Sequence, residues 1–390
     1  MNRRRFLAAA AAGAAATAAP AAAQIYNPSQ PQQFLQQLTI AVNVTLSGPF
    51  GKYGAEVVKG VQAAVDETNR FNPPISRVFG IRAYDDRNTV PIAATNADIA
   101  AADPSTIGIV GNLTAPMTLA ALSRYANVNF AVVVPTVTAD SITKRGYHNV
   151  FRLPASDTAS GRLFASSALQ GKRGVAALAI SFDGDYGYDV ARAFATQAKA
   201  QHNPSDVLLF PKGKTDPAAA ARTVLDSAPQ YVFLAGKTAE LGPVAQALRT
   251  AGYTGEFGAS DGFYNAETIT SYGKALDGAL VASPMPPLER IPSMAMYLTD
   301  FEHEAGQITA FSAYGYAAAQ VLIAASERTN ATTRFSVLTT MQQGGTFQTL
   351  VGNFTFNING DPLIPDIYLY RVGTSGFTYV RPAIRSGFII

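Results

Sequence analysis

The hydrophobic pattern of the chain opens with a buried strand followed by an amphipathic helix. Residues 38–45 read Leu-Thr-Ile-Ala-Val-Asn-Val-Thr, and this β-branched run between a polar segment and a glycine-rich turn predicts a buried strand. Residues 47–54 form the turn. The apolar residues after it recur at three-and-four spacing, which predicts a helix with one apolar face: Val57, Val58, Val61, Ala64 and Val65.

A strand, a glycine-rich turn and a helix in this order form the opening unit of a parallel α/β domain. The alternation continues with predicted strands at 79–84, 106–110 and 130–134 and with helices at 91–102 and from 116 to about 126. Four such repeats predict a parallel sheet covered on both faces. Since ligands in these domains bind beyond the carboxyl ends of the strands, we expect the turn at 47–54 to line a binding crevice.

A second series of the same kind starts after residues 150–154. Ser156 and Asp157 are an N-cap signature for a helix that runs to Gln170. The series then continues with strands predicted at 174–180, 206–210, 231–235, 256–259 and 278–283 and with helices at 186–201, 217–227 and 239–251. Two α/β series of similar size predict two lobes with a crevice between them.

The last part of the chain returns to the first series. Helical patterns lie around 294–305 and 308–328, and short strands are expected near Phe354, at 367–371 and at 377–380. Pro154, Pro284 and the turn at 357–360 mark three passages between the lobes, and several crossing strands make a hinge.

We therefore predict an α/β fold of two Rossmann-like lobes with parallel sheets, joined by a three-strand hinge. The expected first lobe contains residues 38–154 and 284–356, and the expected second lobe contains residues 155–283 and 357–390.

The amino terminus has the three regions of an export signal. Arg3, Arg4 and Arg5 precede an alanine-rich run, and small residues at 21–23 predict cleavage near Ala23/Gln24. The arginines resemble the twin-arginine type, and an ordinary Sec signal is the alternative. We therefore expect residues 1–23 to be removed and the mature protein to be periplasmic.

Composition narrows the function further. The 390 residues include 30 Lys and Arg and 27 Asp and Glu, so removal of the three signal arginines leaves a formally neutral body. Without a basic block, nucleic acid is not an expected partner. The chain has no cysteine, which excludes disulfides, thiol catalysis, cysteine-ligated metals and a lipid-anchored amino-terminal cysteine. No later apolar run reaches the ~18 residues that a membrane helix needs.

Two motifs suggest other chemistry. Gly48, Gly51 and Gly54 resemble a dinucleotide turn, but Pro49 stands where backbone would donate N–H to a phosphate. Residues 258–262 match GxSxG, and a hydrolase would use Ser260 with His303.

The three histidines, His148, His202 and His303, are too scattered for a metal site. We expect no cofactor, no metal and no catalytic residue.

Polar groups after the predicted strands suit a small zwitterion. Thr114 and Ala115 stand at a helix start, where free N–H groups favour an anion. Thr136 and Thr138 add hydroxyls at the next strand end. In the second series Asp261 could meet an ammonium group.

Two aromatic residues complete this expected site. Tyr53 and Tyr186 could cover the apolar part of a ligand and still place a hydroxyl at its rim.

Four segments in one order carry a family resemblance. Residues 40–54, 84–86, 143–152 and 185–189 resemble the periplasmic leucine/isoleucine/valine-binding family, the type I solute receptors of branched-chain amino acid ABC transporters. The similarity extends from about residue 38 to residue 330. It implies two lobes that close on a ligand through three hinge strands, and an inner-membrane ABC permease as partner.

The resemblance assigns roles to individual residues. Tyr53 matches the aromatic residue over the ligand side chain, and Thr138 matches the hydroxyl residue at the head group, with Thr136 contributing backbone. Tyr186 matches the aromatic residue of the second lobe, and Asp261 matches the acid that meets the α-ammonium group.

Three departures from the family pattern affect the ligand. Ala115 replaces the serine that holds the carboxylate, with Thr114 beside it; Lys237 and Thr238 replace a more aromatic loop; and the family disulfide is missing. We include Thr238 in the expected site. The ligand is then an amino acid, an aromatic acid or an amide.

The prediction is a monomeric, non-enzymatic solute-binding receptor of an ABC importer. An extracytoplasmic sensor of the same fold and the GxSxG hydrolase are the alternatives.

Overall fold

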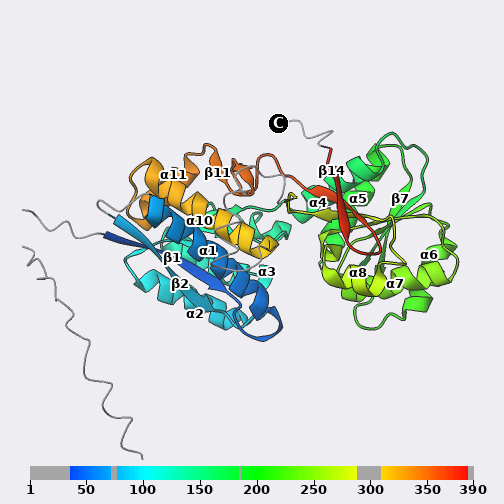
Figure 1. The fold of residues 1–390 in the computed structure, drawn as a ribbon, viewed down its shortest axis with the longest axis horizontal. Helices are drawn as coiled ribbons and strands as arrows, with labels where there is room; N and C mark the ends of the chain where they lie inside the picture. The colour runs from blue at the N-terminus through cyan, green and yellow to red at the C-terminus, as the bar shows by residue number, and fades with distance from the viewer. Residues whose placement is uncertain (1–35, 72–76, 184–185, 288–308, 385–390) are drawn as a thin grey trace, which may run out of the picture.

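The computed structural model describes residues 36–71, 77–183, 186–287 and 309–384 and places them in two α/β bodies (Figure 1). The first lobe has a five-stranded sheet in the order β2-β1-β3-β4-β5, in which every pair is parallel. Its strands are β1 (Gln36–Val44), β2 (Arg77–Asp85), β3 (Thr106–Gly111), β4 (Ala131–Val134) and β5 (Val150–Arg152).

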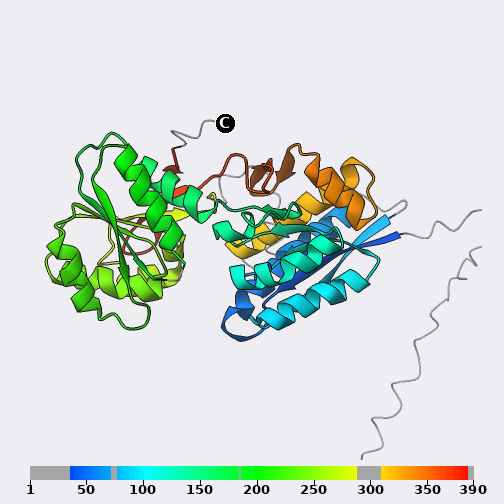
Figure 2. The same cartoon turned by 180° about the vertical axis from the view of Figure 1, so that it is seen from behind.

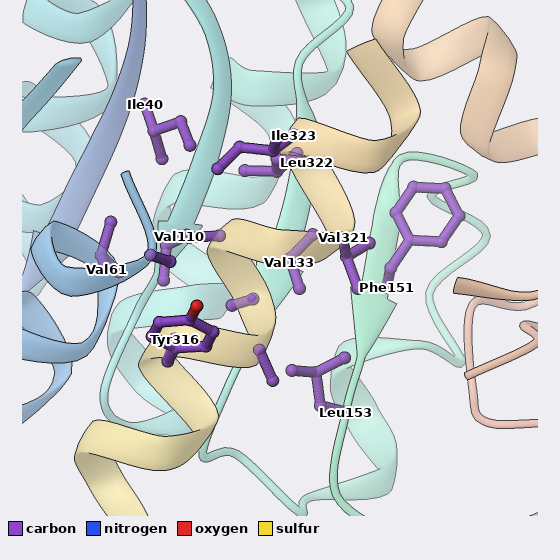
Figure 3. Packing of buried hydrophobic residues seen from close by; sticks show 14 of the residues in the cluster. Ile40, Val61, Val110, Val133, Phe151, Leu153, Tyr316, Val321, Leu322 and Ile323 are labelled. Carbon is purple, nitrogen blue, oxygen red and sulfur yellow. The ribbon is translucent and has the colours of Figure 1, made fainter. Parts of the chain in front are cut away.

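Helices cover both faces of this sheet, as the apolar run of its first strand requires. Leu38, Ile40 and Val42 pack with α1 (Gly51–Phe71) and α10 (Ala310–Arg328), whereas Ala41 faces α2 (Val90–Ala102) and α3 (Ala115–Asn127). Figure 3 shows the first of these clusters, with side chains of the sheet against α10. Figure 2 shows α2 and α3 on the opposite face.

Two glycines bring α1 and α10 into backbone contact. A Cβ on Gly60 would overlap the carbonyl oxygen of Ser312, and a Cβ on Gly315 would overlap that of Val57. The helices therefore meet at a distance that only glycine allows at these two positions. This approach also sets the Tyr53 ring against Phe311, with centroids 4.7 Å apart.

The second lobe has a seven-stranded sheet in the order β14-β13-β10-β9-β8-β6-β7. Five of these strands are parallel: β6 (Ala177–Phe182), β7 (Ser205–Phe210), β8 (Tyr231–Leu234), β9 (Glu256–Ala259) and β10 (Leu280–Ser283). One face packs against α4 (Asp157–Ala168) and α5 (Tyr188–Ala200), and the other against α6 (Pro217–Asp226), α7 (Thr238–Thr250) and α8 (Ala266–Tyr272).

The end of the chain differs from the parallel pattern expected for both sheets. β13 (Tyr368–Val372) and β14 (Phe377–Pro382) join the second sheet as antiparallel strands. In the first lobe, a short helix, α11 (Arg334–Gln342), and a hairpin of β11 (Phe347–Thr349) and β12 (Gly352–Phe354) follow α10. The sequence pattern did not predict α11. None of the helices in the described ranges is long and apolar enough to cross a bilayer.

The first turn of the chain also differs from the prediction. The turn expected at 47–54 is shorter, because a 3-10 turn at Gly48–Phe50 leads directly into α1 at Gly51. Gly54 is therefore a helix residue, and a Cβ there would overlap the carbonyl oxygen of Thr45. The helix expected at 294–305 lies outside the described residues, and the pattern at 308–328 corresponds to α10.

The chain passes between the sheets three times. The first connection follows β5, the second follows β10 and leads to α10, and the third runs from β12 to β13. In Figures 1 and 2 the colours confirm this order, since α10 and α11 lie in the first lobe and β14 in the second. The lobe boundaries at single residues remain predictions.

Candidate functional site

The predicted site residues lie after the carboxyl ends of parallel strands in both lobes. In the first lobe Tyr53 follows β1, Thr114 and Ala115 follow β3, and Thr136 and Thr138 follow β4. Parallel strands end at the same edge of a sheet, so these loops share one edge.

In the second lobe Tyr186, Thr238 and Asp261 follow β6, β8 and β9 in the same way. All of these residues thus lie after strand ends, as the sequence predicted, and their contact with a ligand stays a prediction.

The start of α3 has features of an anion site. Thr114 is the N-cap residue, yet its side chain makes no capping bond. Its hydroxyl oxygen is buried and has no hydrogen-bond partner among the described residues. Ala115 begins the helix, so Thr114 stands beside the free N–H groups and the positive end of the helix dipole.

Two carboxylates shape the loops next to α3. Buried Asp86 accepts hydrogen bonds from the Thr45 hydroxyl (2.5 Å) and the Asn112 amide (3.1 Å), which ties the ends of β1, β2 and β3 together. Asp85 accepts from the backbone N–H groups of Leu46 and Arg87, both at 2.8 Å. Desolvation opposes ionisation of Asp85, but these bonds outweigh it and lower its pKa.

The loop at 136–139, which we call the ligand loop because the predicted ligand-binding residues Thr136 and Thr138 belong to it, is fixed on both sides. The Thr136 hydroxyl donates to the Leu113 carbonyl (3.2 Å), which links this loop to the loop between β3 and α3. The Thr138 side chain hydrogen-bonds Asp157, and the Thr138 carbonyl accepts the backbone N–H of Asp157 (2.9 Å). Thr138 is therefore the point where the predicted site meets the first connection between the lobes.

In the second lobe the Tyr186 hydroxyl donates to the Asp261 carboxylate. Burial raises the pKa of Asp261, and the hydrogen bond from Tyr186 offsets only part of this effect. Burial also raises the pKa of Tyr186, and the charges of Asp261 and Asp157 add to it. Two predicted site residues are thus joined in one hydrogen-bonded pair.

Asp157 belongs to the same electrostatic group, although its motif was interpreted only as an N-cap. Ser156 is the capping residue, as predicted, and Asp157 follows as the first helical residue. Desolvation raises the pKa of Asp157 to about 7. The hydrogen bond from Thr138 and the charge of Arg152 oppose this shift, while the charges of Asp261 and Asp140 reinforce it. A nearby cation would therefore stabilise the ionised form.

Two predicted residues have other contacts. The Thr238 hydroxyl donates to the Gly262 carbonyl (3.0 Å) and hydrogen-bonds Thr268 (2.7 Å), so in this structure it supports the loop that carries Asp261. The Tyr53 ring lies against Phe311 in its own lobe. A direct ligand contact by either residue remains a prediction.

The two other motifs have structural explanations. The Ser260 hydroxyl accepts the Gly236 N–H and donates to the Gly236 carbonyl, both at 3.1 Å, and its residue is only 1% exposed. His303 lies outside the described residues. In the dinucleotide-like turn, Gly51 and Gly54 are the close-packed start of α1.

Comparison with known proteins agrees with the fold. The model of a family described as "Periplasmic binding protein" matches residues 37–377. The "Leu/Ile/Val-binding protein homolog 1" of Brucella suis biovar 1 (strain 1330) is 23% identical over 335 residues, which cover 85% of this chain and 89% of that protein.

Solved structures give the same result. A leucine binding protein from Thermotoga maritima MSB8 has a TM-score of 0.75 at 21% identity and covers 89% of this chain and 99% of its own. An ABC transporter substrate-binding protein from Desulfitobacterium hafniense, in complex with Leu, has a TM-score of 0.75 at 22% identity. The match covers 88% of this chain and 100% of that protein. The predicted α/β fold of a type I binding protein is confirmed.

Proposed function

Because this chain belongs to the periplasmic binding protein family, we propose that it is the solute-binding receptor of an ABC importer. Its two lobes close on a small amino acid or a related carboxylate or amide. Two observations support this proposal: half-buried Asp261 and buried Asp157 in the second lobe have raised pKa values, and the start of α3 in the first lobe has free N–H groups. A ligand with an ammonium group and a carboxylate group can pair the first with the acids and the second with the N–H groups of α3.

We assign the ammonium group to Asp261. Its carboxylate accepts a hydrogen bond from the Tyr186 hydroxyl and has a raised pKa, because desolvation makes its ionised form unfavourable. A bound cation offsets part of this free-energy cost. We assign the carboxylate of the ligand to the α3 start, where the Thr114 hydroxyl has no partner among the described residues. Tyr53, Thr136, Thr138 and Thr238 complete the proposed lining, with Ala115 at the helix start.

Closure follows from the division of these groups between two lobes. A ligand that contacts both strand edges binds the closed arrangement better than the open one, and it shifts the population accordingly. We infer that the closed form is presented to an inner-membrane ABC permease by a monomer.

We further infer that the protein acts in the periplasm after export, with residues 1–23 removed near Ala23/Gln24. We also infer that it performs no catalysis, a proposal supported by the two bonds between Ser260 and Gly236.

A thermal-shift screen tests the proposed function directly. The panel contains the amino acids, small aromatic acids and their amides, each added to the purified mature protein. A compound at ~100 times its Kd adds roughly 2.7 kcal/mol, so the melting temperature should rise by several degrees. Calorimetry then gives the stoichiometry. A panel without any shift, or a compound that the protein turns over, would contradict the proposal.

Replacement of Asp261 by asparagine should weaken the binding of an amine ligand by about 10- to 100-fold. The substitution removes a charge-assisted hydrogen bond worth roughly 1.5–3 kcal/mol while it retains the side-chain size. Titration calorimetry measures the change. Asp206→Asn is the control, since it removes a carboxylate whose side chain is 85% exposed. An affinity within about twofold of the wild type would mean that Asp261 is not the counter-ion.

A further inference from the structure

Arg152 is a fully buried cation at the end of β5, where the chain leaves the first lobe. Its side chain has an exposed fraction of 0%. The guanidinium forms an ion pair with Asp361, to which Nε donates at 3.0 Å. Nη1 donates to the carbonyls of Thr138 (2.7 Å) and Ala139 (2.6 Å), and Nη2 donates to the Thr143 hydroxyl (3.1 Å).

These partners belong to segments with different roles. Thr138 and Ala139 are in the ligand loop, whereas Asp361 is in the third connection between the lobes. Arginine suits this position because its planar fork has five donors and can bond several acceptors at once.

Asp361 is itself held in place from the first lobe. The Thr143 hydroxyl donates to its carboxylate (3.0 Å), and the Arg152 backbone N–H donates to the Gly360 carbonyl (2.8 Å). Gly360 has a φ of +86°, and a Cβ there would overlap the carbonyl oxygen of Val150. The middle of the third connection is therefore fixed on β5 by backbone and side-chain contacts together.

The first connection reaches the same loop. The Thr138 carbonyl, which accepts from Arg152, also accepts the N–H of Asp157 at the start of α4 in the second lobe. One carbonyl thus joins the ligand loop to the first connection, and one guanidinium joins it to the third.

We propose that Arg152 is a positioning residue that makes the ligand loop and two of the three connections one rigid unit. The angle between the lobes and the position of Thr138 then change together, so that occupancy of the site is transmitted to the hinge. This inference deepens the proposed function and rests on it for the role of the ligand loop. The rigid unit itself is a property of the unliganded protein.

Arg249 provides a matched control. Its guanidinium donates to the carbonyls of Ala275 (3.1 Å), Tyr253 (2.7 Å) and Gly255 (2.9 Å), all of which belong to the second lobe. Loss of either arginine removes several bonds to backbone carbonyls. Only loss of Arg152 frees segments that connect the lobes.

The test measures the distribution of distances between the lobes. Since the chain contains no cysteine, Ser123→Cys on α3 and Ala218→Cys on α6, both exposed, place one spin label on each lobe. Pulsed dipolar spectroscopy then compares wild type, Arg152→Gln and Arg249→Gln without added ligand. We expect Arg152→Gln to make the distribution roughly twice as wide, because the connections then move independently. Arg249→Gln should lower the melting temperature but keep the wild-type width.

Asp361→Asn keeps the side-chain size and breaks only the ion pair, so it replaces Arg152→Gln in the comparison if that variant does not fold. Equal widths for the folded variant and for Arg249→Gln would overturn the proposal, because both arginines would then be merely structural. The result is separate from the ligand screen. A wider distribution with no thermal shift for any compound supports the rigid unit and contradicts the proposed function.

Discussion

Gly60→Ala should lower the melting temperature by roughly 5–10 °C, although alanine is the better helix former by about 1 kcal/mol. The added methyl group would overlap the Ser312 carbonyl, and because the obstacle is backbone, α1 and α10 must separate. Overpacking of this kind costs about 3 kcal/mol, and each kcal/mol corresponds to ~2–4 °C in a domain of this size. Thermal unfolding followed by circular dichroism measures the loss.

Ala55→Gly is the control for Gly60→Ala. It makes the reverse exchange at an exposed position of the same helix, so it reports helix propensity alone, about 1 kcal/mol. If Gly60→Ala were as stable as the wild type, the close contact of α1 with α10 would be wrong. Without this close packing of α1 and α10, the contact between the Phe311 and Tyr53 rings would also have no explanation.

Asp157→Asn should raise the melting temperature by several degrees at pH 8 and change it little at pH 4. The pKa of Asp157 is about 7 in the folded state against an ordinary value of 3.8 for an aspartate, so the folded protein holds a proton that the unfolded chain releases. Between pH 4 and pH 7 the wild-type stability therefore falls as the pH rises, and the full penalty is present above pH 7. At about 1.4 kcal/mol per pKa unit, the penalty is at most roughly 4 kcal/mol.

Melting curves at intervals from pH 4 to pH 8 test this sign. The difference between variant and wild type should grow with pH, and parallel curves would contradict the assignment. Asp206→Asn serves again as the control for the loss of one exposed carboxylate. We also expect Asp157→Asn to bind an amine ligand more weakly, because a destabilising buried charge at a site is commonly retained for function.

The alternation of strands and helices could be predicted from the sequence, because the spacing of apolar residues within one strand or helix is a local property of the chain. The run at 38–45 corresponds to β1, and the predicted site residues do follow the carboxyl ends of their strands. Parallel pairing alone ensures this result, whatever the register. The direction of β13 and β14 was not predictable in the same way, because it depends on how the third connection returns to the second sheet.

Side-chain environments were harder to predict than elements. Asp157 follows a serine cap in sequence, and nothing local indicates that Thr138 and Asp261 lie near it. Arg152 was noted only within a family motif, and its partner Asp361 is 209 residues away. Thr238 follows a strand like the other expected residues, but its hydroxyl turns toward Gly262. α11 could have been predicted, because Thr333 and Ser336 form a capping box at its start.

The three connections have a consequence for biosynthesis. One face of the first sheet is covered by α10, which begins at residue 310, and the second sheet lacks its outer strands until residue 382 has been made. Neither core is complete while the ribosome is still translating the middle of the gene. A polypeptide that stops near residue 287 lacks α10 and leaves Val110 of β3 and Val133 of β4 without this cover, so it should aggregate or be degraded. Both lobes of the receptor can therefore have complete cores only after β14 has been made.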